Sequence, residues 1–422
     1  MLRRIRINGY KSFHGLDLTL GAVAVVIGPN GAGKSNLLDA IQLVSGFVTQ
    51  PSLQEAFDGH RGLPLESMWY GEHGFDGLRE QESVRCRFGV DVELSESVLE
   101  ETERTIAQKR HGLDTERDGA RQRVLERLLR HEIEIELLPR TGVLRVVDER
   151  VQALKSDLTP KANRVAFLER VDGQLRLRME GQGRPSEFPL GLDHTIMSTS
   201  LYEPHYPHVT ALRREMSRWR TYYLEPRTLM REDVPVSEVR GIGPRGENLA
   251  AYLNTLKNQW PSSFDSFRRA VGTIMPNRPE IDVALTKEGM VGLKVTEATC
   301  EFSGRLISEG TLRLLGLLAA VHPDSPATLV GYEEPENGVH PARIRTIADI
   351  MHRACTQYGK QLLVTTHSPL LATSFPRDSW YACRREGPGS VIEPLGCQGP
   401  LLAEGDVEEA LSEAMIRGDF GG

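Results

Sequence analysis

Apolar residues near the start of the chain follow a two-residue period and then form a continuous run. Residues 2–7 alternate, which predicts a strand with one buried face, and residues 16–20 predict a second strand. Residues 23–27 (Val-Ala-Val-Val-Ile) are all apolar, as is typical of a strand buried on both faces. A helical period follows over 36–44, and 84–94 return to a strand pattern. The chain is therefore predicted to begin as an α/β unit.

The middle of the chain has a different pattern. Residues 96–131 are polar, arginine-rich and helical in period, which predicts two solvated helices or an arm that faces DNA or a partner. Residues 132–190 predict short strands and turns, with strands at 133–137 and 174–179 and a loop over 181–189. Within 209–220 four arginines recur at near-helical spacing, on a surface helix or in a phosphate-binding patch: Arg213, Arg214, Arg218 and Arg220.

The last part of the chain alternates helix and strand. Helices are predicted over 248–260 and 264–275, and strands over 281–285 and 291–295. Residues 300–385 continue the alternation, which indicates a parallel sheet with helices packed on it. Residues 406–416 predict an amphipathic closing helix.

Composition excludes several classes of protein. The net charge of −7 over 422 residues does not favour nucleic-acid binding, so any DNA contact would need a local basic patch. Five cysteines lie far apart without CxxC spacing, which argues against zinc and disulfides and fits a reducing compartment. The N-terminus lacks the apolar core of a signal peptide, and the longest apolar run, around 314–321, is too short to span a membrane. We expect a cytoplasmic protein.

The segment that follows the predicted strand 23–27 reads Gly28-Pro-Asn-Gly-Ala-Gly-Lys-Ser35 and matches G-x-x-x-x-G-K-[ST] in full. It lies between a buried strand and a helix, which is the context that supports such a match. Glycines let the backbone curl so that its N–H groups face phosphates, and the helix dipole favours an anion there. Lys34 would reach the β- and γ-phosphates and Ser35 would ligate Mg²⁺. The alternative is a glycine turn with a chance lysine.

Two adjacent carboxylates, Glu333 and Glu334, end the strand predicted over 328–332. Successive side chains of a strand point to opposite faces, so the two cannot share one task. Glu333 is placed to hold the magnesium shell, through a metal-bound water because its side chain is longer than the usual aspartate. Glu334 is placed to orient or deprotonate an attacking water. An exposed acidic turn is the alternative interpretation.

Two further sites could bind a phosphate. Ser308-Glu-Gly310-Thr precedes an apolar helix predicted over 312–321, and a hydroxyl with free N–H groups at a helix start can bind an anion or simply cap the helix. His367 follows a strand predicted over 361–366 and could donate to a γ-phosphate, although a lone histidine in such a place is more often structural. The order of the four features favours one common site.

This order resembles the ABC-type ATPases of the SMC/RecF branch. The likeness is greatest to predicted bacterial AAA-type ATPases with an EEPENGVHP segment, which are related to the ATPase part of OLD-family proteins. It also extends to Tyr10-Lys-Ser-Phe13, Tyr223-Leu-Glu-Pro226 and residues 247–253, 306–318 and 363–371. The resemblance implies an α/β P-loop NTPase fold: an ABC-ATPase head with a mixed sheet, flanking helices and a helical and β insertion between Walker A and the signature motif.

The resemblance also implies roles for particular residues. The catalytic residues would be Glu334 and the switch histidine, His367, and the Mg²⁺ ligands Ser35 and Glu333. Pro335–Gly338 would form the D-loop. The ATP-binding residues would be Asn30, Gly31, Gly33, Lys34, Ser35, Asn36, and Ser308 and Gly310 of the signature motif. That motif reads Ile-Ser-Glu-Gly-Thr rather than Leu-Ser-Gly-Gly-Gln. Together with the glutamate at 333 this predicts slow turnover. The Q-loop has no secure counterpart, and residues 222–227 are the best match.

By the same likeness the chain divides into an N-terminal lobe with Walker A (1–95), an inserted arm (96–220), a C-terminal lobe (221–395) and a tail (396–422). Two copies would enclose two ATPs as a homodimer. Some relatives carry a C-terminal Toprim nuclease domain, but only about 55 residues follow His367. A nuclease would therefore be a separate effector subunit.

Three functions can be compared on this basis. The first is a dimeric ATPase that acts on DNA, through local basic patches, in repair or antiphage defence. The second is the motor of a membrane transporter, which is disfavoured because about 270 residues separate the P-loop from Ser308. The third is a regulatory scaffold that uses ATP to hold a dimer together, with little hydrolysis and no direct DNA contact.

Overall fold

The computed structural model describes residues 1–71, 74–110, 124–181, 183–275, 279–297 and 300–395. The chain folds into two compact units, and each is made of segments distant in sequence. In the described ranges, the first unit comprises residues within Met1–Gly21, Asn36–Trp219 and Arg384–Glu393, and the second comprises residues within Ala22–Ser35 and Arg220–Cys383, together with Pro394 and Leu395. The P-loop strand therefore belongs to the second unit, although it lies near the start of the chain.

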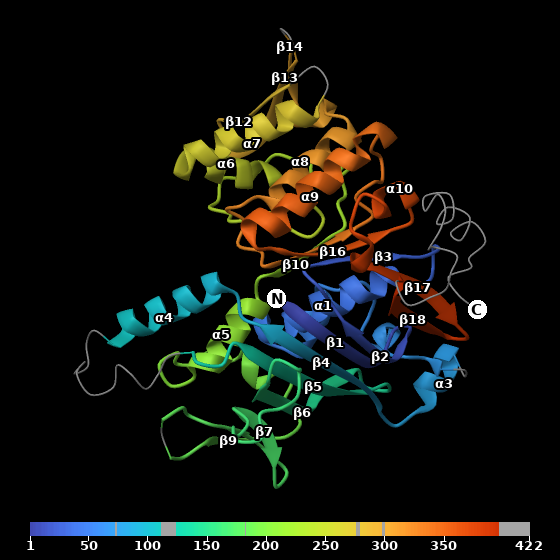
Figure 1. Ribbon diagram of the computed structural model, residues 1–422, viewed down its shortest axis with the longest axis vertical. Helices are drawn as coiled ribbons and strands as arrows, with labels where there is room; N and C mark the ends of the chain where they lie inside the picture. The colour runs from blue at the N-terminus through green and yellow to red at the C-terminus, as the bar shows by residue number, and fades with distance from the viewer. Residues whose placement is uncertain (72–73, 111–123, 182, 276–278, 298–299, 396–422) are drawn as a thin grey trace. The chain divides into compact units, whose positions relative to one another are not determined.

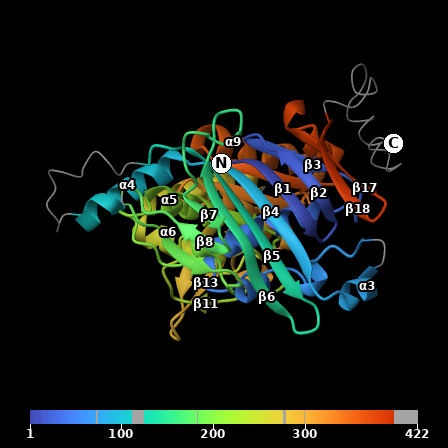
Figure 2. The ribbon, with the colours of Figure 1, turned by 90° about the horizontal axis from the view of Figure 1, so that it is seen from below.

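The first unit is built on an antiparallel sheet in the order β2-β1-β4-β5-β6-β7-β8-β9. Its long strands run side by side in Figure 2. Burial alternates along them, so one face of the sheet packs on the core of the unit. The strands are β1 (Leu2–Tyr10), β2 (Phe13–Thr19), β4 (Val84–Glu93), β5 (Leu128–Leu138), β6 (Val143–Ala153), β7 (Leu168–Val171), β8 (Gln174–Leu177) and β9 (Ser186–Pro189).

Helices and short 3-10 turns complete the first unit. They are α1 (Lys34–Thr49), which enters this unit at Asn36, α2 (Leu53–Asp58), η1 (Leu65–Ser67), α3 (Gly74–Glu80), α4 (Glu96–Arg110), η3 (Ile196–Ser198) and α5 (Pro207–Met216). The apolar side chains of α1, such as Leu37, Ile41 and Val44, are buried.

The second unit holds the sheet on which the P-loop lies. The strand order is β10-β15-β16-β3-β17-β18, with β15, β16, β3 and β17 mutually parallel. Every residue of β16 is buried, as expected of a strand covered on both faces. The strands are β3 (Val23–Ile27), β10 (Trp219–Tyr222), β15 (Leu329–Glu333), β16 (Gln361–Thr366), β17 (Trp380–Glu386) and β18 (Gly389–Pro394). Of these, Trp219, the end of β17 from residue 384 and residues 389–393 of β18 are counted with the first unit.

Helices and a smaller antiparallel sheet cover this core. Helices α6 to α9 lie together beside the sheet in Figure 1, and their apolar residues join one buried cluster with those of β3, β15 and β16. The elements are α6 (Leu249–Gln259), α7 (Pro261–Ile274), η4 (Gly304–Leu306), α8 (Glu309–Val321), η5 (Pro341–Arg343), α9 (Ile344–Tyr358), α10 (Pro369–Ala372) and η6 (Arg377–Ser379). Strands β11 (Val234–Pro235), β12 (Glu280–Leu285), β13 (Met290–Glu297) and β14 (Cys300–Ser303) form the smaller sheet, with β13 in the middle.

Most predicted elements match the structure, with a few exceptions. The window 96–131 is helical only to residue 110 in the described part, and Leu128–His131 begin a strand. The prediction was wrong there because β5 pairs over its whole length with β4 and β6, and tertiary pairing overrides a weak helical pattern. Residues 186–189, expected in a loop, form the edge strand β9. The helix predicted over 406–416 lies outside the described residues.

The arginines of 209–220 do not form one helical row, because α5 ends at Met216 and Arg220 lies on β10. Arg213 donates to the carbonyls of Val48 and Thr199. Arg214 and Arg218 both pair with Glu101. These three guanidinium groups therefore bind other parts of the first unit.

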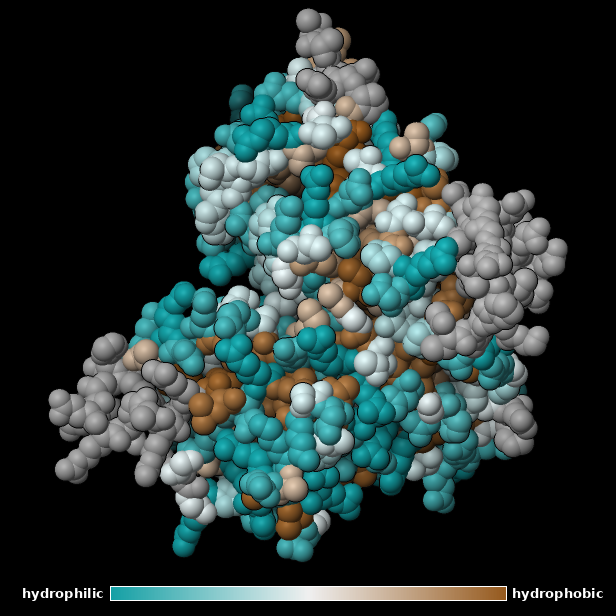
Figure 3. All heavy atoms as spheres, in the orientation of Figure 1, coloured by the Kyte–Doolittle hydropathy of each residue, from teal (hydrophilic) through white to brown (hydrophobic). Residues whose placement is uncertain are grey.

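The surface seen in Figure 3 mixes hydrophilic and hydrophobic residues. Within the described ranges, none of the helices combines the length and the apolar character needed to cross a membrane.

Candidate nucleotide-binding site

The P-loop connects β3 to α1, and its glycines are required for two different reasons. Gly31 and Gly33 have φ of 79° and 108°, in a region that residues with a side chain rarely adopt. Gly28 does not have a positive φ, but a Cβ built on it would lie 2.2 Å from the carbonyl oxygen of Cys383. Close packing against β17 therefore excludes a side chain at the first position of the motif.

The Lys34 ammonium group is buried within the loop. Its Nζ donates to the carbonyl oxygens of Gly28 at 2.8 Å and Pro29 at 3.0 Å. Burial lowers the pKa of Lys34, while the negative charges of Glu334 and neighbouring groups oppose that shift. The ammonium group thus lies inside the curve of the loop, held by backbone carbonyl oxygens.

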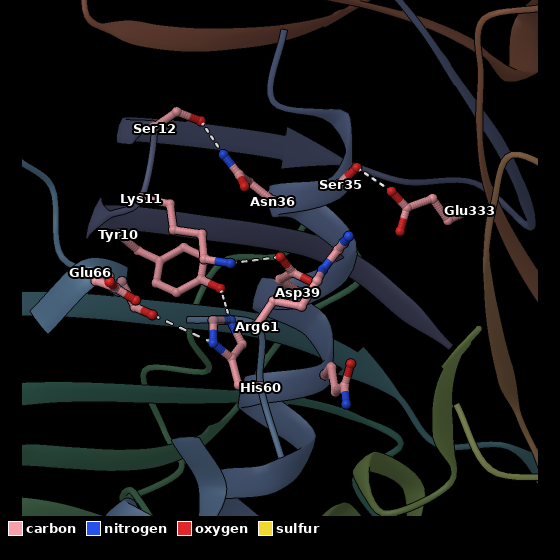
Figure 4. A network of polar contacts seen from close by, with 12 residues as sticks. Tyr10, Lys11, Ser12, Ser35, Asn36, Asp39, His60, Arg61, Glu66 and Glu333 are labelled. Atoms are coloured by element: carbon pink, nitrogen blue, oxygen red, sulfur yellow. Dashed lines mark hydrogen bonds and ion pairs between the residues drawn. The ribbon is translucent and has the colours of Figure 1, made fainter. Parts of the chain in front are cut away.

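The predicted magnesium ligands meet although their strands are not adjacent, because Glu333 ends β15, Ser35 lies on α1 after β3, and β16 lies between β15 and β3. Glu333 pairs in register with Thr365 on β16, and Thr366 pairs with Ile27 at the end of β3. The Oγ of Ser35 donates to the Oε1 of Glu333 at 2.5 Å, as Figure 4 shows. Both are oxygen donors of the kind that Mg²⁺ prefers, so Ser35 and Glu333 would be the residues that hold the ion.

Glu334 lies next to His367. Its Oε1 is 3.2 Å from the Nδ1 of His367, and its Oε2 accepts a hydrogen bond from the Nδ2 of Asn337 at 2.6 Å. The carboxylate side chain is 24 % exposed and the histidine side chain 42 % exposed. Both groups are therefore accessible to a water molecule and to a phosphate.

Ser308 and Gly310 open α8. The Ser308 hydroxyl accepts a hydrogen bond from Thr311 N at 3.2 Å and donates to Thr311 Oγ1, so it caps the helix and remains exposed. A Cβ on Gly310 would lie 2.7 Å from the carbonyl oxygen of Gly338. The predicted signature and D-loop segments are therefore in direct contact.

The remaining predicted residues occupy different surroundings. Asn30 and Gly31 are exposed at the tip of the loop. Asn36 donates from Nδ2 to the Oγ of Ser12 at 2.8 Å. In the stretch considered for the Q-loop, Arg227 forms a 2.7 Å ion pair with Glu309 of the signature segment.

Sequence reasoning missed a cavity in the first unit. It has a volume of about 850 Å³, and basic and aromatic side chains line it, including Lys11, Arg61, Arg385, Trp69 and Tyr70. Lys11 and Arg61 both pair with the buried carboxylate of Asp39 on α1 (Figure 4). In the sequence, residues 10–13 stand out only through the family likeness, and residues 61–75 carry no motif that would indicate a cavity.

Comparison with known proteins places the chain in a family. Residues 23–373 match the family AAA_21, described as "AAA domain, putative AbiEii toxin, Type IV TA system". A 54-residue stretch is 44 % identical to the OLD nuclease of Thermus scotoductus. That stretch covers 13 % of this chain and only 10 % of the nuclease, so the likeness is local.

Solved structures agree on the fold. A crystal structure of the SMC head bound to the C-winged helix domain of ScpA superposes with a TM-score of 0.53 at 12 % identity, over 93 % of this chain and 97 % of that one. The SMC head with an extended coiled coil, bound to the C-terminal domain of ScpA derived from Pyrococcus furiosus, gives 0.51 at 12 % identity, over 93 % and 95 %. The mixed α/β architecture is thus that of the ABC-ATPase heads of SMC proteins, as the sequence predicted. With a full-length P-loop, this fold and a family match over most of its length, the chain belongs to the AAA_21 family of P-loop ATPases.

Proposed function

We propose that this chain binds and hydrolyses ATP with Mg²⁺ as a homodimer that acts on DNA, in repair or antiphage defence, together with a separate effector such as a nuclease. The observation that carries the proposal is the meeting of Ser35 with Glu333 and of Glu334 with His367 at the ends of parallel strands beside the P-loop. One pair supplies metal ligands, and the other supplies a base and a hydrogen-bond donor.

Each residue has a distinct chemical task in this proposal. Lys34 and the P-loop N–H groups bind the phosphates, and Ser35 and Glu333 hold the metal ion. Bound Mg²⁺ would neutralise charge on the phosphate oxygens. Glu334 accepts a proton from the attacking water, and His367 donates a hydrogen bond to the γ-phosphate. The exposure of both side chains supports these roles.

The dimer proposal is supported by the signature segment. Ser308 is exposed at the start of α8, and its N-terminal N–H groups favour an anion. Leu306, two residues earlier, is 73 % exposed, which is high for a leucine and fits a surface that a second copy covers. In the dimer each Ser308 would contact the γ-phosphate held by the other copy.

The DNA proposal is supported by the local likeness to a nuclease, and one observation favours the alternative of a regulatory scaffold without direct DNA contact. Arg213, Arg214 and Arg218, which could have formed a phosphate-binding patch, bind carbonyls and Glu101 inside the first unit. The net charge of −7 points the same way.

ATP turnover and the association state test the proposal together. We expect Glu334→Gln to reduce turnover about 100-fold or more, the range for a lost general base, and to accumulate an ATP-bound dimer in sedimentation. Lys34→Ala serves as a control that binds no nucleotide and stays monomeric. Normal turnover of Glu334→Gln would contradict the assigned base, and a monomer at saturating ATP would contradict the shared site. If DNA neither binds nor changes turnover, the scaffold is the better description.

A further inference from the structure

The backbone of Glu334 adopts a conformation that must be held in place. Its φ is 47°, in the left-handed region that is unfavourable for a residue with a Cβ. Its N–H donates to the carbonyl oxygen of Thr365 on β16 at 2.9 Å. Such a conformation persists only where surrounding contacts determine it, and here it directs the carboxylate toward His367.

Asn337 supplies one of these contacts. Its N–H donates to the carbonyl oxygen of Glu334 at 3.1 Å, and its side-chain Nδ2 donates to Glu334 Oε2 at 2.6 Å. A carboxylate only accepts hydrogen bonds, so the amide nitrogen of Asn337 must face it. With His367 at the other oxygen, both Oε atoms of Glu334 are restrained.

Glu336 acts on the histidine side of the pair. Its side chain is 6 % exposed, and its Oε1 accepts hydrogen bonds from Thr366 Oγ1 at 2.5 Å and from the N–H of His367 at 3.2 Å. Its Oε2 is buried without a hydrogen-bond partner in the described part of the chain. Burial accordingly raises the pKa of Glu336. Burying a carboxyl group with one oxygen unpaired is costly in free energy. The other oxygen, Oε1, restrains the side chain of Thr366 and the backbone of His367.

We propose that Asn337 positions the carboxylate of Glu334 and that Glu336 positions His367, so that these two neighbouring residues set the geometry of hydrolysis. The inference rests on the proposed ATPase function. Neither residue is assigned a contact with ATP, so both are positioning residues. They should therefore affect kcat and leave nucleotide binding unchanged, because binding depends on the P-loop.

Asn337→Ala tests the first half. We expect kcat to fall about tenfold while the KM for ATP stays within about twofold of the wild-type value. This is the result expected when the lost interaction stabilises the transition state and not the bound nucleotide. Asn258→Ala is the matched control, since that exposed asparagine in the same unit donates Nδ2 to Asn254 O at 2.8 Å. In a Glu334→Gln background Asn337→Ala should cause no further loss of residual turnover. An unchanged kcat, or the same loss in both backgrounds, would overturn the role.

Glu336 is tested by comparing two substitutions. Glu336→Gln keeps an oxygen acceptor for Thr366 and His367 and should retain kcat within about threefold, whereas Glu336→Ala should lower kcat about tenfold at constant KM. If the alanine variant does not fold, Thr366→Val removes the hydrogen bond from Thr366 to Glu336, together with the one that Thr366 accepts from the N–H of Ser368, with little change in volume, and it should also lower kcat. A folded variant without this contact but with normal kcat would overturn the role of Glu336.

The experiments separate the proposed ATPase function from the positioning roles of Asn337 and Glu336. If the wild-type chain does not hydrolyse ATP, or if Glu334→Gln hydrolyses it normally, the proposed function fails and this inference fails with it. If Glu334→Gln is inactive while Asn337→Ala and the Glu336 variants behave as wild type, the proposed function stands and only the positioning roles are overturned.

Discussion

Replacing Gly28 by alanine should destabilise the second unit more than replacing Gly31 by alanine, although both glycines belong to the P-loop. A Cβ at position 28 would lie 2.2 Å from the backbone carbonyl oxygen of Cys383, far inside ordinary contact, which begins near 3.4 Å. A Cβ at position 31 would meet no heavy atom within 4 Å, and only its φ of 79° is unfavourable.

The two costs can be estimated from these geometries. At position 28 either β3 or β17 must move by about an ångström, because the opposing atom belongs to the backbone and cannot rotate away. Overpacking of this kind costs about 3 kcal/mol, at the upper end of the usual range. At position 31 the left-handed conformation of alanine costs about 1 kcal/mol. For a unit of this size the difference corresponds to a melting temperature lower by roughly 4–8 °C in the Gly28 variant than in the Gly31 variant.

Thermal and urea unfolding of the full chain measure this difference, with the fraction unfolded followed by circular dichroism. Cys383→Ala is the control, because it removes the thiol and leaves the carbonyl oxygen in place, so it should not rescue Gly28→Ala. The reasoning is refuted if Gly28→Ala is as stable as the wild type, or if Gly31→Ala is the less stable variant.

Two further predictions concern ionisable side chains in the first unit. Burial lowers the pKa of His60 to about 4, with Lys11 adding to the shift and Asp39 opposing it, so the unfolded chain binds the proton first as the pH falls below about 6.5. The contribution of His60 to the free energy of unfolding should therefore be full above that pH and fall by about 2 kcal/mol by pH 5. In urea unfolding at several pH values, His60→Gln should remove this part of the pH dependence. An unchanged pH dependence in the variant would contradict the prediction. Asp91, which is fully buried, accepts two hydrogen bonds from Arg130 at 2.6 and 2.8 Å, so Asp91→Ala should destabilise the chain by about 3–5 kcal/mol, with partial recovery in Asp91→Ala/Arg130→Met. A loss below about 1 kcal/mol in equilibrium unfolding would show that Arg130 finds another partner.

The local sequence determined the elements whose patterns are strong. The apolar run 23–27 is a strand over the predicted residues, and the P-loop follows it into a helix, because a buried strand and a glycine-rich turn leave few alternatives. The apolar runs of β15 and β16 likewise predict two strands, but their parallel pairing, which brings Glu333 and Thr365 to the same sheet edge, was decided by the tertiary structure. The later part of β5 was predicted as a strand over 133–137, but its first residues, 128–131, have a helical pattern and could not be predicted in this way.

Only the tertiary structure decided which contacts surround these residues. The carbonyl oxygen of Cys383 lies 2.2 Å from the position that a Cβ on Gly28 would take, although the two residues are more than 350 positions apart, and nothing in either local segment predicts this. The same holds for the ion pairs of Arg214 and Arg218 with Glu101, and for the burial of Glu336 against Thr366. Local sequence specifies secondary structure because it acts through neighbours along the chain. The burial and charge of a side chain depend on packing across the fold, which is set by distant segments.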